Sequence, residues 1–399
     1  MNERGATFGA KALLLICVTS AAWAFSFGVG SQVVSHWLSR LRQNDAVIGW
    51  AHSFYYFGLA VAAFAVPRLA RQIGYFRCGA IGMIGSGVTL AVFPWCEGEL
   101  AWYLLRFLNG CAGALSLVPL ETIVSRESPA DKKTLNFGCY GVAITIGGAL
   151  GIALGLEFFE HVSPVGSFYL GSGPTVWAGL ILVIARDIHA ETEAITKTPL
   201  GWTRNYLSYA TAWYQGFLEG GMIAFLSLFL VSRGFSRDGA GILMSITTVG
   251  VIAFQLPVSM LADRFGKRPL LLGCYGVVAL GLATIPWLST AVWFGTVLFV
   301  FGACTGAMYP LGLSLLGDRT VESGLARAYA WYLAVECFGS QAGAAAMGGA
   351  RKVWGEDAMF AVGLGAAGAV LVIGVSLRLL LRDQRDSITS LDGDQRQAA

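Results

Sequence analysis

Long apolar stretches follow one another along most of the chain, separated by short segments that carry charged residues, proline or polar clusters. A helix of about 20 apolar residues crosses the roughly 30 Å hydrocarbon layer of a bilayer. Backbone polar groups inside lipid must pair within their own segment, and the alternating pattern of a barrel strand is absent. The pattern therefore predicts an all-α membrane protein with twelve transmembrane helices. The predicted spans are 11–38, 46–66, 78–95, 100–124, 137–156, 169–185, 205–231, 239–261, 270–289, 292–316, 328–349 and 358–380.

The second six spans repeat the first six at a shift of 192 residues. At this offset ten glycines coincide, Gly74 with Gly266 for example, whereas glycine frequency alone predicts about three coincidences. An even number of spans per copy gives both copies the same orientation, as in parallel repeats related by an axis along the membrane normal. We therefore expect an N-terminal six-helix bundle over 1–185 and a C-terminal six-helix bundle over 204–381.

Composition supports the membrane assignment and excludes other partners. Hydrophobic residues make up 55% of the chain, charged residues 13%, and the mean hydropathy is +0.63, so polar side chains are too few to cover a water-facing surface. The formal net charge is +3, with no basic run or base-stacking aromatic pattern, so we expect no nucleic-acid partner. The eight cysteines show no metal-ligand spacing. We expect no metal, no cofactor and a monomer in the lipid bilayer.

Lysine and arginine concentrate on one side of the predicted topology. The other side holds only Arg40, Arg42, Arg233, Arg237, Arg351 and Lys352. The positive-inside rule then puts both termini in the cytoplasm. The segment 186–203, with mixed charge and Pro199, is interpreted as a cytoplasmic interdomain linker. The segment 382–399 is polar and lacks apolar periodicity, so we expect a disordered cytoplasmic tail.

The most specific motif lies between the eighth and ninth predicted spans. Residues 259–268 read Ser-Met-Leu-Ala-Asp-Arg-Phe-Gly-Lys-Arg, which resembles the G-x-L-A-D-R-x-G-R-K loop signature of the major facilitator superfamily (MFS). In that family the loop acts as a conformational latch. The resemblance implies a gating loop made of Leu261, Ala262, Asp263, Arg264, Gly266, Lys267 and Arg268. Physically, glycine permits a tight turn, and an aspartate can sit near positive helix N-termini. The alternative is a charged loop that only obeys the positive-inside rule.

The first copy of this loop departs from the family pattern. It reads Pro-Arg-Leu-Ala-Arg-Gln-Ile-Gly over residues 67–74, with Arg71 where the family usually has aspartate. The gating candidates of the first copy are therefore Arg71 and Gly74, with a positive charge where the family has a negative one. A basic residue followed by Ile-Gly-aromatic is similar to a bacterial branch of the family, the YcaD-type permeases. The resemblance covers the whole chain and implies a central cavity lined by helices 1, 4, 7 and 10, in a bacterial cytoplasmic (inner) membrane.

Three charged residues fall inside predicted spans, namely Glu219, Glu336 and Arg106. An ionised side chain near mid-membrane costs at least about 2.5–3.5 kcal/mol, so it usually faces protein or water and has a function. The glutamates are candidates for proton or substrate binding, or else structural carboxyl groups that are hydrogen-bonded between helices. Arg106 begins an R-x-x-x-G pattern like that of the family, or clamps carbonyls or a glutamate. Glu121 lies near a cytoplasmic helix end, where we expect it to reach interfacial water; it is a further candidate for proton or substrate binding, although a structural role is favoured.

Neutral residues supply candidates for a cavity wall, with plain helix packing as the alternative for each. The main candidates are Trp23, Gln32, Tyr214 and Trp331, and further ones are Phe27, Tyr55, Trp213, Gln255 and Tyr309. In the fifth span Gly138, Gly147, Gly148 and Gly151 follow the spacing of the family's antiporter signature, although Gly148 and Ile152 replace its proline and last glycine. Close helix packing explains these glycines equally well.

These features together predict a secondary transporter that moves a small organic solute by alternating access, coupled to protons, with export slightly favoured. No G-x-x-x-x-G-K-[ST] loop indicates an ATP-driven pump. Uptake by proton symport is the first alternative. A transport-dead sensor or scaffold with the same fold is the second, supported by the reversed charge at Arg71. We expect no enzyme activity and no catalytic residues, because the sequence has no metal cluster, nucleophile elbow or histidine-rich helix.

Overall fold

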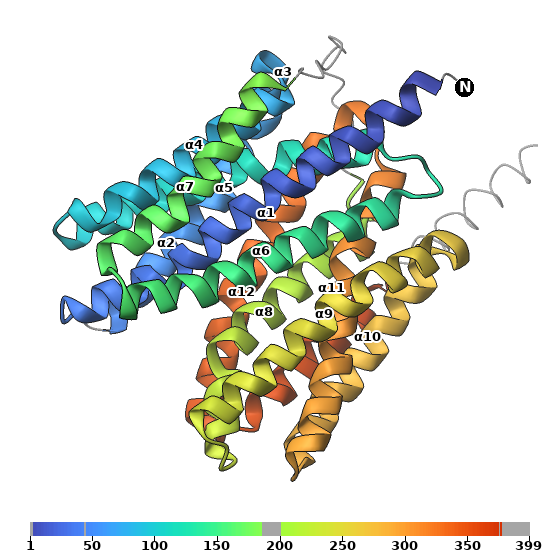
Figure 1. The fold of residues 1–399 in the computed structure, drawn as a ribbon. Coiled ribbons are helices and arrows are strands. Elements are labelled where there is room, and N and C mark those ends of the chain that lie inside the picture. The colour runs from blue at the N-terminus through green and yellow to red at the C-terminus, as the bar shows by residue number, and fades with distance from the viewer. Residues whose placement is uncertain (1–2, 44, 186–200, 375, 377–399) are drawn as a thin grey trace, which may run out of the picture.

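The computed structural model describes residues 3–43, 45–185, 201–374 and 376, and these form an almost entirely α-helical protein (Figure 1). The first half of the chain contains α1 (Glu3–Arg40), α2 (Asp45–Ala63), α3 (Val66–Ile73), α4 (Tyr75–Val92), η1 (Phe93–Trp95), α5 (Glu99–Glu127), α6 (Lys133–His161) and α7 (Pro164–Ile184). The second half contains α8 (Tyr206–Ser232), α9 (Arg237–Phe265), α10 (Lys267–Thr284), η2 (Ile285–Trp287), α11 (Ala291–Arg319), η3 (Glu322–Gly324), α12 (Leu325–Trp354) and a last helix over Ala358–Gly374. The all-helical prediction is confirmed. Most of the predicted linker and all of the predicted tail lie outside the described residues.

Helix boundaries in the two halves are related by the same offset of 192 residues as the sequence. α4 and α10 begin and end at equivalent positions, and so do α5 and α11. Even the short helices η1 and η2 correspond, and each ends in Pro-Trp. The repeat thus extends from individual residues to the points where helices start and stop.

Among the described residues, nine helices are long and apolar enough to cross a membrane. The pair α2 and α3, bent by 58°, makes ten when it is taken as one span. Two predicted spans fall outside this set: α12, which contains charged residues such as Arg327 and Glu336, and the shorter helix Ala358–Gly374. The count of twelve spans stays a prediction.

The prediction that residues 67–74 and 259–268 form charged loops is wrong, because most of these residues are helical. Residues 66–73 form α3, and Leu261, Ala262, Asp263 and Arg264 belong to the last turns of α9. Only one glycine in each copy interrupts the helices, Gly74 with φ of 95° and Gly266 with φ of 100°. Glycine adopts a positive φ at little cost, so a single residue can redirect the chain from one helix into the next. Charged side chains at such helix ends can still reach water, so an extended loop is not needed to hydrate them.

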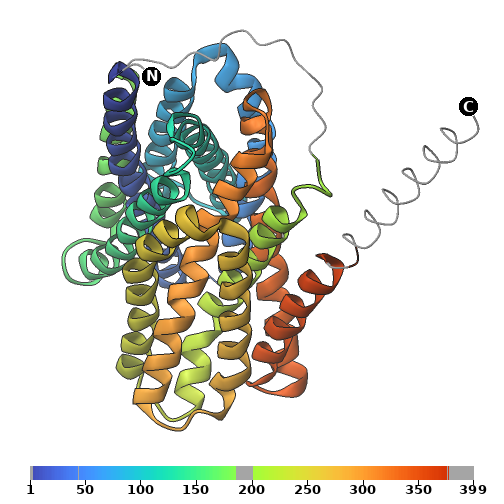
Figure 2. The ribbon, with the colours of Figure 1, turned by 90° about the vertical axis from the view of Figure 1, so that its right-hand side faces the viewer.

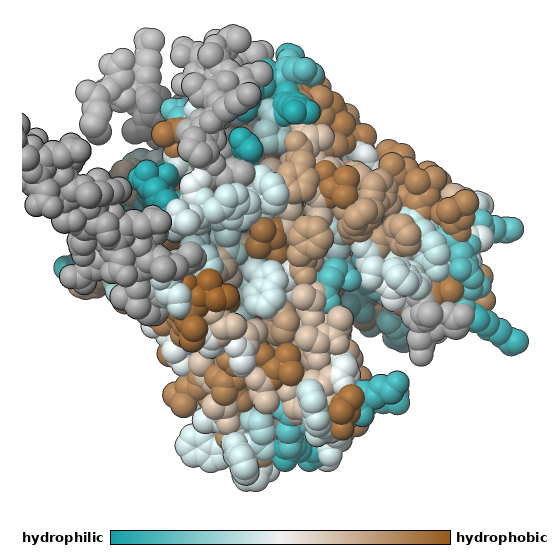
Figure 3. All heavy atoms as spheres, turned by 180° about the vertical axis from the view of Figure 1, so that it is seen from behind, coloured by the Kyte–Doolittle hydropathy of each residue, from teal (hydrophilic) through white to brown (hydrophobic). Residues whose placement is uncertain are grey.

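Helices of the two halves form two groups, coloured blue to green and yellow to red in Figures 1 and 2. α6 packs on α9 and α11, and α12 packs on α2 and α5, so these helices join the groups. One buried hydrophobic cluster contains only residues of the second half, whereas the largest cluster combines both halves. On the face in Figure 3, hydrophobic residues cover broad areas and hydrophilic residues gather toward the edges. A surface of this kind suits contact with lipid.

Candidate functional site

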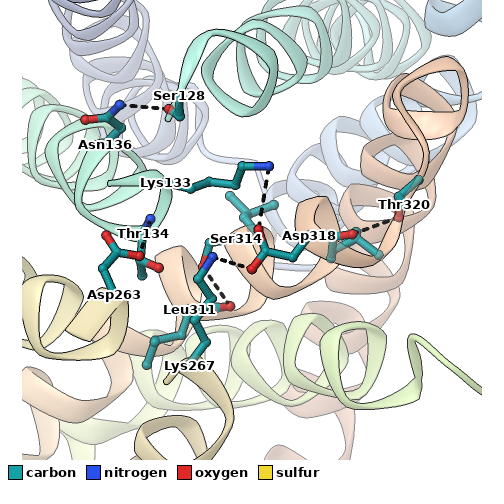
Figure 4. A network of polar contacts seen from close by, with 12 residues as sticks. Ser128, Lys133, Thr134, Asn136, Asp263, Lys267, Leu311, Ser314, Asp318 and Thr320 are labelled. Carbon is teal, nitrogen blue, oxygen red and sulfur yellow. Dashed lines mark hydrogen bonds and ion pairs between the residues drawn. The ribbon is translucent and has the colours of Figure 1, made fainter. Parts of the chain in front are cut away.

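The carboxylate of Asp263 joins the two halves at the end of the bundle where α9 stops. Its Oδ1 accepts a hydrogen bond from the backbone N–H of Thr134 at 3.0 Å, and its Oδ2 accepts one from the N–H of Leu135 at 2.8 Å (Figure 4). Both amides belong to the first turn of α6, where N–H groups have no acceptor inside their own helix. The negative charge also complements the positive end of the helix dipole. We call this contact the Asp263 cap.

Ion pairs surround the Asp263 cap. Asp318, near the end of α11, pairs with Lys267 of its own half and with Lys133 of the first half, whose Nζ is 3.6 Å from Oδ1 (Figure 4). A second pair across the halves joins Arg126 of α5 to Glu322 of η3 at 2.7 Å. A cavity of about 370 Å³ lies beside the cap. Its lining residues include Asp263, Gly266, Lys267, Arg268 and Asp318. We call the end of the bundle that carries these contacts the basic end.

The remaining predicted gating residues contribute less. Arg264 is exposed and lies over the ring of Phe265, with 5.4 Å between its Cζ and the ring centroid. Arg71 is exposed on α3 and forms no ion pair with another described residue. The structure therefore brings Asp263, Lys267 and Arg268 together and leaves Arg71 outside the cap.

Glu121 is the most deeply buried of the predicted carboxylates, with 1% of its surface exposed. Its Oε1 accepts a hydrogen bond of 2.6 Å from the Tyr309 hydroxyl, which reaches across from α11 in the other half. Oε2 is buried and has no hydrogen-bond partner among the described residues. The expectation that Glu121 reaches interfacial water is wrong, because helices of both halves cover this turn of α5.

Glu336 and Glu219 lie on neighbouring helices, α12 and α8. The two backbones touch, since a Cβ on Gly216 would lie 2.1 Å from the Glu336 carbonyl oxygen. The Tyr309 ring, whose hydroxyl bonds to Glu121, lies 6.4 Å from the Tyr332 ring, one helical turn before Glu336 on α12. Among the described residues, no lysine, arginine or histidine forms an ion pair with these glutamates. These contacts link Glu121, Tyr309, Glu336 and Glu219 from helix to helix, and we call this set the acidic chain.

Arg106 lies in the half of α5 farther from the basic end, and 3% of its surface is exposed. Its guanidinium stands over the ring of Tyr55, with 4.6 Å between Cζ and the centroid. Nε and Nη2 are buried and lack hydrogen-bond partners among the described residues. Neither a glutamate nor a carbonyl among the described residues bonds to Nε or Nη2, so these two donors give no support to the reading of Arg106 as a clamp.

Aromatic residues of α1 and α2 lead from Trp23 toward Arg106. The rings of Trp23 and Phe27 are stacked at 5.9 Å, and Phe27 lies 5.4 Å from Tyr55. The indole Nε1 of Trp23 is buried and has no hydrogen-bond partner among the described residues. Trp23 thus lies at the start of a row of rings that ends at Arg106, and its role as a cavity wall stays a prediction beside plain packing.

The other neutral candidates do not gather at this place. The prediction for Tyr214 is wrong, because its ring stacks on Tyr275 at 5.2 Å and its hydroxyl donates to the Gly363 carbonyl, inside the core of the second half. Trp331 packs between Phe64 and Trp202 and serves as a contact between the halves. Gln32 is half-buried on α1, and no hydrogen bond joins its side chain to another described residue.

A polar contact between α2 and α12 was not predicted. The Ser53 hydroxyl donates to Oε1 of Gln341 at 3.1 Å. A cavity of about 310 Å³ lies between the same helices. Its lining includes Ser53, Tyr56, Ala60, Cys337 and Gln341. Neutral side chains in an apolar segment give no signal in a single sequence, so only the packing of the halves reveals them.

The sequence profile of the Major Facilitator Superfamily matches residues 12–236 and again residues 207–398. The chain belongs to the Major Facilitator Superfamily. It is a multi-pass membrane protein of the bacterial MFS transporter type, and it is not an enzyme. Transporters of this superfamily bind small-molecule substrates within a membrane, which gives a context for the buried charges.

Relatives in sequence include the MFS-type transporter YfkF of Bacillus subtilis (strain 168), 24% identical over 315 residues, which cover 76% of this chain and 79% of YfkF. The MFS-type transporter YcaD of Salmonella arizonae is 24% identical over 301 residues, covering 72% of this chain and 75% of YcaD. The predicted similarity to YcaD-type proteins is thus confirmed.

Two solved structures share the fold at 13% identity. The human organic anion transporter MFSD10 (TETRAN) superposes with a TM-score of 0.75, over 92% of this chain and 99% of that one. The transporter FucP, in the outward conformation, superposes with a TM-score of 0.72, over 91% and 98%. At this identity the likeness establishes the fold alone.

Proposed function

We propose that this protein is a secondary active transporter that moves a small organic solute across the bacterial inner membrane by alternating access. The two bundles, 1–185 and 204–381, would rock about a central site, with 186–203 as the cytoplasmic linker and 382–399 as a disordered cytoplasmic tail. Twelve spans would place both termini in the cytoplasm, and the protein would work as a monomer. The solute and the proton are its partners, and it needs no cofactor.

The Asp263 cap is the observation that carries this proposal. It joins α9 of one half to the N-terminus of α6 in the other, and its partners are backbone amides that only this carboxylate satisfies. Such a contact can be broken and remade as the halves rock, which is how a latch controls the populations of two states. With the basic end in the cytoplasm, the described state is closed toward the cytoplasm.

Proton coupling is proposed from the acidic chain. Its three carboxylates have no cationic partner among the described residues, and they extend from the basic end toward the middle of the bundle. A carboxyl group binds or releases a proton as its surroundings alternate between low dielectric and water. Rocking of the halves changes exactly this exposure. The chain of Glu219, Glu336 and Glu121 is therefore the proposed route by which the proton gradient drives the solute.

Flux measurements in proteoliposomes test the proposal. A panel of labelled solutes is assayed with and without a pH gradient, in both orientations of the gradient. We expect the wild type to accumulate or expel at least one solute in a gradient-dependent way. The direction relative to the gradient distinguishes export by exchange from uptake by symport. No flux of any solute would favour the transport-dead scaffold, which the exposed, unpaired Arg71 supports.

Two variants separate proton coupling from folding. Glu219→Gln and Glu336→Gln keep the size of the side chain and remove the charge, and Glu99→Gln, on an exposed position of α5, is the matched control. We expect Glu219→Gln and Glu336→Gln to be made in normal amounts and to lose dependence on the gradient. Unchanged pH-driven flux in both would remove the acidic chain from the mechanism.

A further inference from the structure

Two charged side chains of opposite sign, Arg106 and Glu219, lie within apolar helices on opposite halves of the protein, and neither forms an ion pair with another described residue. Arg106, in the first half, keeps two donors unpartnered among the described residues, and its guanidinium stands over the ring of Tyr55. Glu219, in the second half, has no cation acting on it. An isolated charge inside a protein is costly unless it is paired, so each of these groups is prepared for a partner that the chain itself does not supply.

Tyr56 connects the two charges in space. The Tyr55 ring, which lies under the Arg106 guanidinium, meets the Tyr56 ring edge-on, with 5.6 Å between the centroids. On the other side α12 packs on α2, and the Ser340 carbonyl of α12 touches Gly220 of α8, the residue next to Glu219. Tyr56 itself lines the cavity of about 310 Å³ between α2 and α12. The guanidinium and the carboxylate thus flank one region at the contact of the halves, the guanidinium on the side of the first half and the carboxylate on the side of the second.

Glu219 is the accessible member of the acidic chain. Its side chain is exposed, whereas Glu336 is half-buried and Glu121 is almost completely covered. A ligand group can therefore meet Glu219 before the other two carboxylates. On the opposite side, the unpartnered donors are those of Arg106 and of Trp23, whose Nε1 can donate but cannot accept. The first half thus offers hydrogen-bond donors, and the second half offers a negative acceptor.

We propose that the transported solute is amphoteric, with a carboxylate-like anionic group that binds Arg106 and an amine-like cationic group that binds Glu219. Such a solute compensates both charges at once and ties the two halves together. An anion alone leaves Glu219 unpaired, and a cation alone leaves Arg106 unpaired. The volume of the neighbouring cavity suits a small molecule, and the rings of Trp23, Phe27 and Tyr55 can pack against an apolar body between the two charged groups.

This inference rests on the proposed transport function and adds the class of substrate. It also gives a reason for proton exchange, because the cationic group and a proton compete for the same carboxylate of Glu219. When the amine binds, the proton must leave Glu219, and when a proton returns, the amine is released. Atoms and charges balance in this step, since one positive charge replaces another.

Binding to the purified full-length chain in lipid nanodiscs tests the charge rule without requiring transport. The probes are matched triples, each containing an amphoteric molecule and its two singly charged relatives. One triple is phenylalanine, 3-phenylpropanoate and phenethylamine, and others are linear ω-amino acids of four to eight carbons with the corresponding fatty acids and alkylamines. Dissociation constants are read from the intrinsic tryptophan fluorescence. We expect at least one amphoteric molecule to bind tenfold or more tightly than both of its relatives.

Variants assign each end of the molecule to its residue. In Arg106→Gln the amphoteric molecule and the amine should bind equally, and in Glu219→Gln the amphoteric molecule and the carboxylate should bind equally. Arg106→Lys, which keeps the charge, should retain a preference for the carboxylate. Arg40→Gln and Glu99→Gln change the same residue types at exposed positions and should leave the ranking unchanged.

Two results would overturn the substrate class. In the first, no triple shows a preference for its amphoteric member in the wild type. In the second, both charge-removing variants keep the wild-type ranking. Either result can coexist with gradient-driven flux of another solute, in which case the transport function stands and only the charge rule fails. If the expected charge ranking appears but no solute is transported, the charge rule stands and the proposed transport function fails.

Discussion

Replacing Asp263 by asparagine removes the charge from the contact that closes the basic end. Asparagine keeps one oxygen, which can still accept from one of the two amides, but it turns an NH2 group toward the other. The variant therefore loses one of the bonds that the carboxylate makes with the N–H groups of Thr134 and Leu135. It also loses the interaction of the charge with the N-terminus of α6.

The structure allows the size of this effect to be estimated. A hydrogen bond to a charged group contributes about 1.5–3 kcal/mol. The charge–dipole interaction at a helix end contributes about 0.3–1 kcal/mol. We take about 2 kcal/mol as the net loss, which lowers the ratio of closed to open basic ends roughly 30-fold.

Hydrogen–deuterium exchange followed by mass spectrometry measures this ratio at the amides themselves. The N–H groups of Thr134 and Leu135 have no acceptor inside α6, so the carboxylate of Asp263 is what protects them in the closed state. We expect peptides that cover these residues to exchange about 30-fold faster in Asp263→Asn, and transport turnover to fall more than the amount of protein in the membrane. Asp238→Asn, at an exposed position in the first turn of α9, the helix that also carries Asp263, is the control. Unchanged exchange at the start of α6, or full transport activity, would refute the reasoning.

Two further pairs of variants test the packing and the acidic chain. Gly147→Ala should lower the free energy of unfolding by about 1–3 kcal/mol, because its Cβ would lie 2.2 Å from the Ala21 carbonyl oxygen of α1. The nearest neighbour of a Cβ on Gly148 is 3.8 Å away, so Gly148→Ala should be neutral or slightly stabilising in thermal unfolding. Equal midpoints for the two would contradict the close contact of α1 and α6. Tyr309→Phe should cost about 1–3 kcal/mol and weaken gradient-dependent flux, since it leaves the buried Glu121 without its donor. Tyr214→Phe removes only a hydrogen bond of 3.3 Å to a carbonyl and should change neither stability nor flux by much. Identical behaviour of the two tyrosine variants would argue against a special role for Tyr309.

The helical class and the duplication follow from the sequence because hydrophobic length and the spacing of glycines are local signals. The offset that pairs Gly74 with Gly266 in the sequence also relates the boundaries of α4 and α10. The shape of the connections could not be read in the same way. Charged residues next to a glycine indicate a loop by composition, yet the chain keeps its helical hydrogen bonds up to each glycine and turns there.

The charged residues of the site could be predicted from the sequence, but the side chains that contact them could not. Glu219, Glu336 and Arg106 stand out because lipid does not tolerate them, and Asp263 stands out through its motif. Tyr214 is indistinguishable from Tyr309 by sequence, since both are tyrosines inside apolar helices, but one faces the core of its own half and the other reaches Glu121. Which way a side chain points depends on how the halves pack, and a single sequence does not contain that information in local form.

One signal for the ion pairs was present in the repeat itself. Asp318 lies 192 residues after Arg126, so equivalent positions of the two copies carry opposite charges. Each of them pairs across the halves, Asp318 with Lys133 and Arg126 with Glu322. Comparison of charges between the two copies would have marked these residues as contacts of the interface.

The central claim, that the two halves rock about a site between them, is tested most directly by distances at the two ends of one helix pair. α6 and α9 pack against each other from opposite halves, so the pair Lys132 and Phe265 reports on the basic end, and the pair Glu160 and Arg237 reports on the opposite end. All four residues are exposed, and spin labels can be attached through noncanonical amino acids, since the chain has eight free cysteines of its own. Double electron–electron resonance in nanodiscs, between high and low pH and with or without a transported solute, should show one distance lengthening as the other shortens. Distances that stay fixed at both ends, or that change together, would contradict alternating access in this protein.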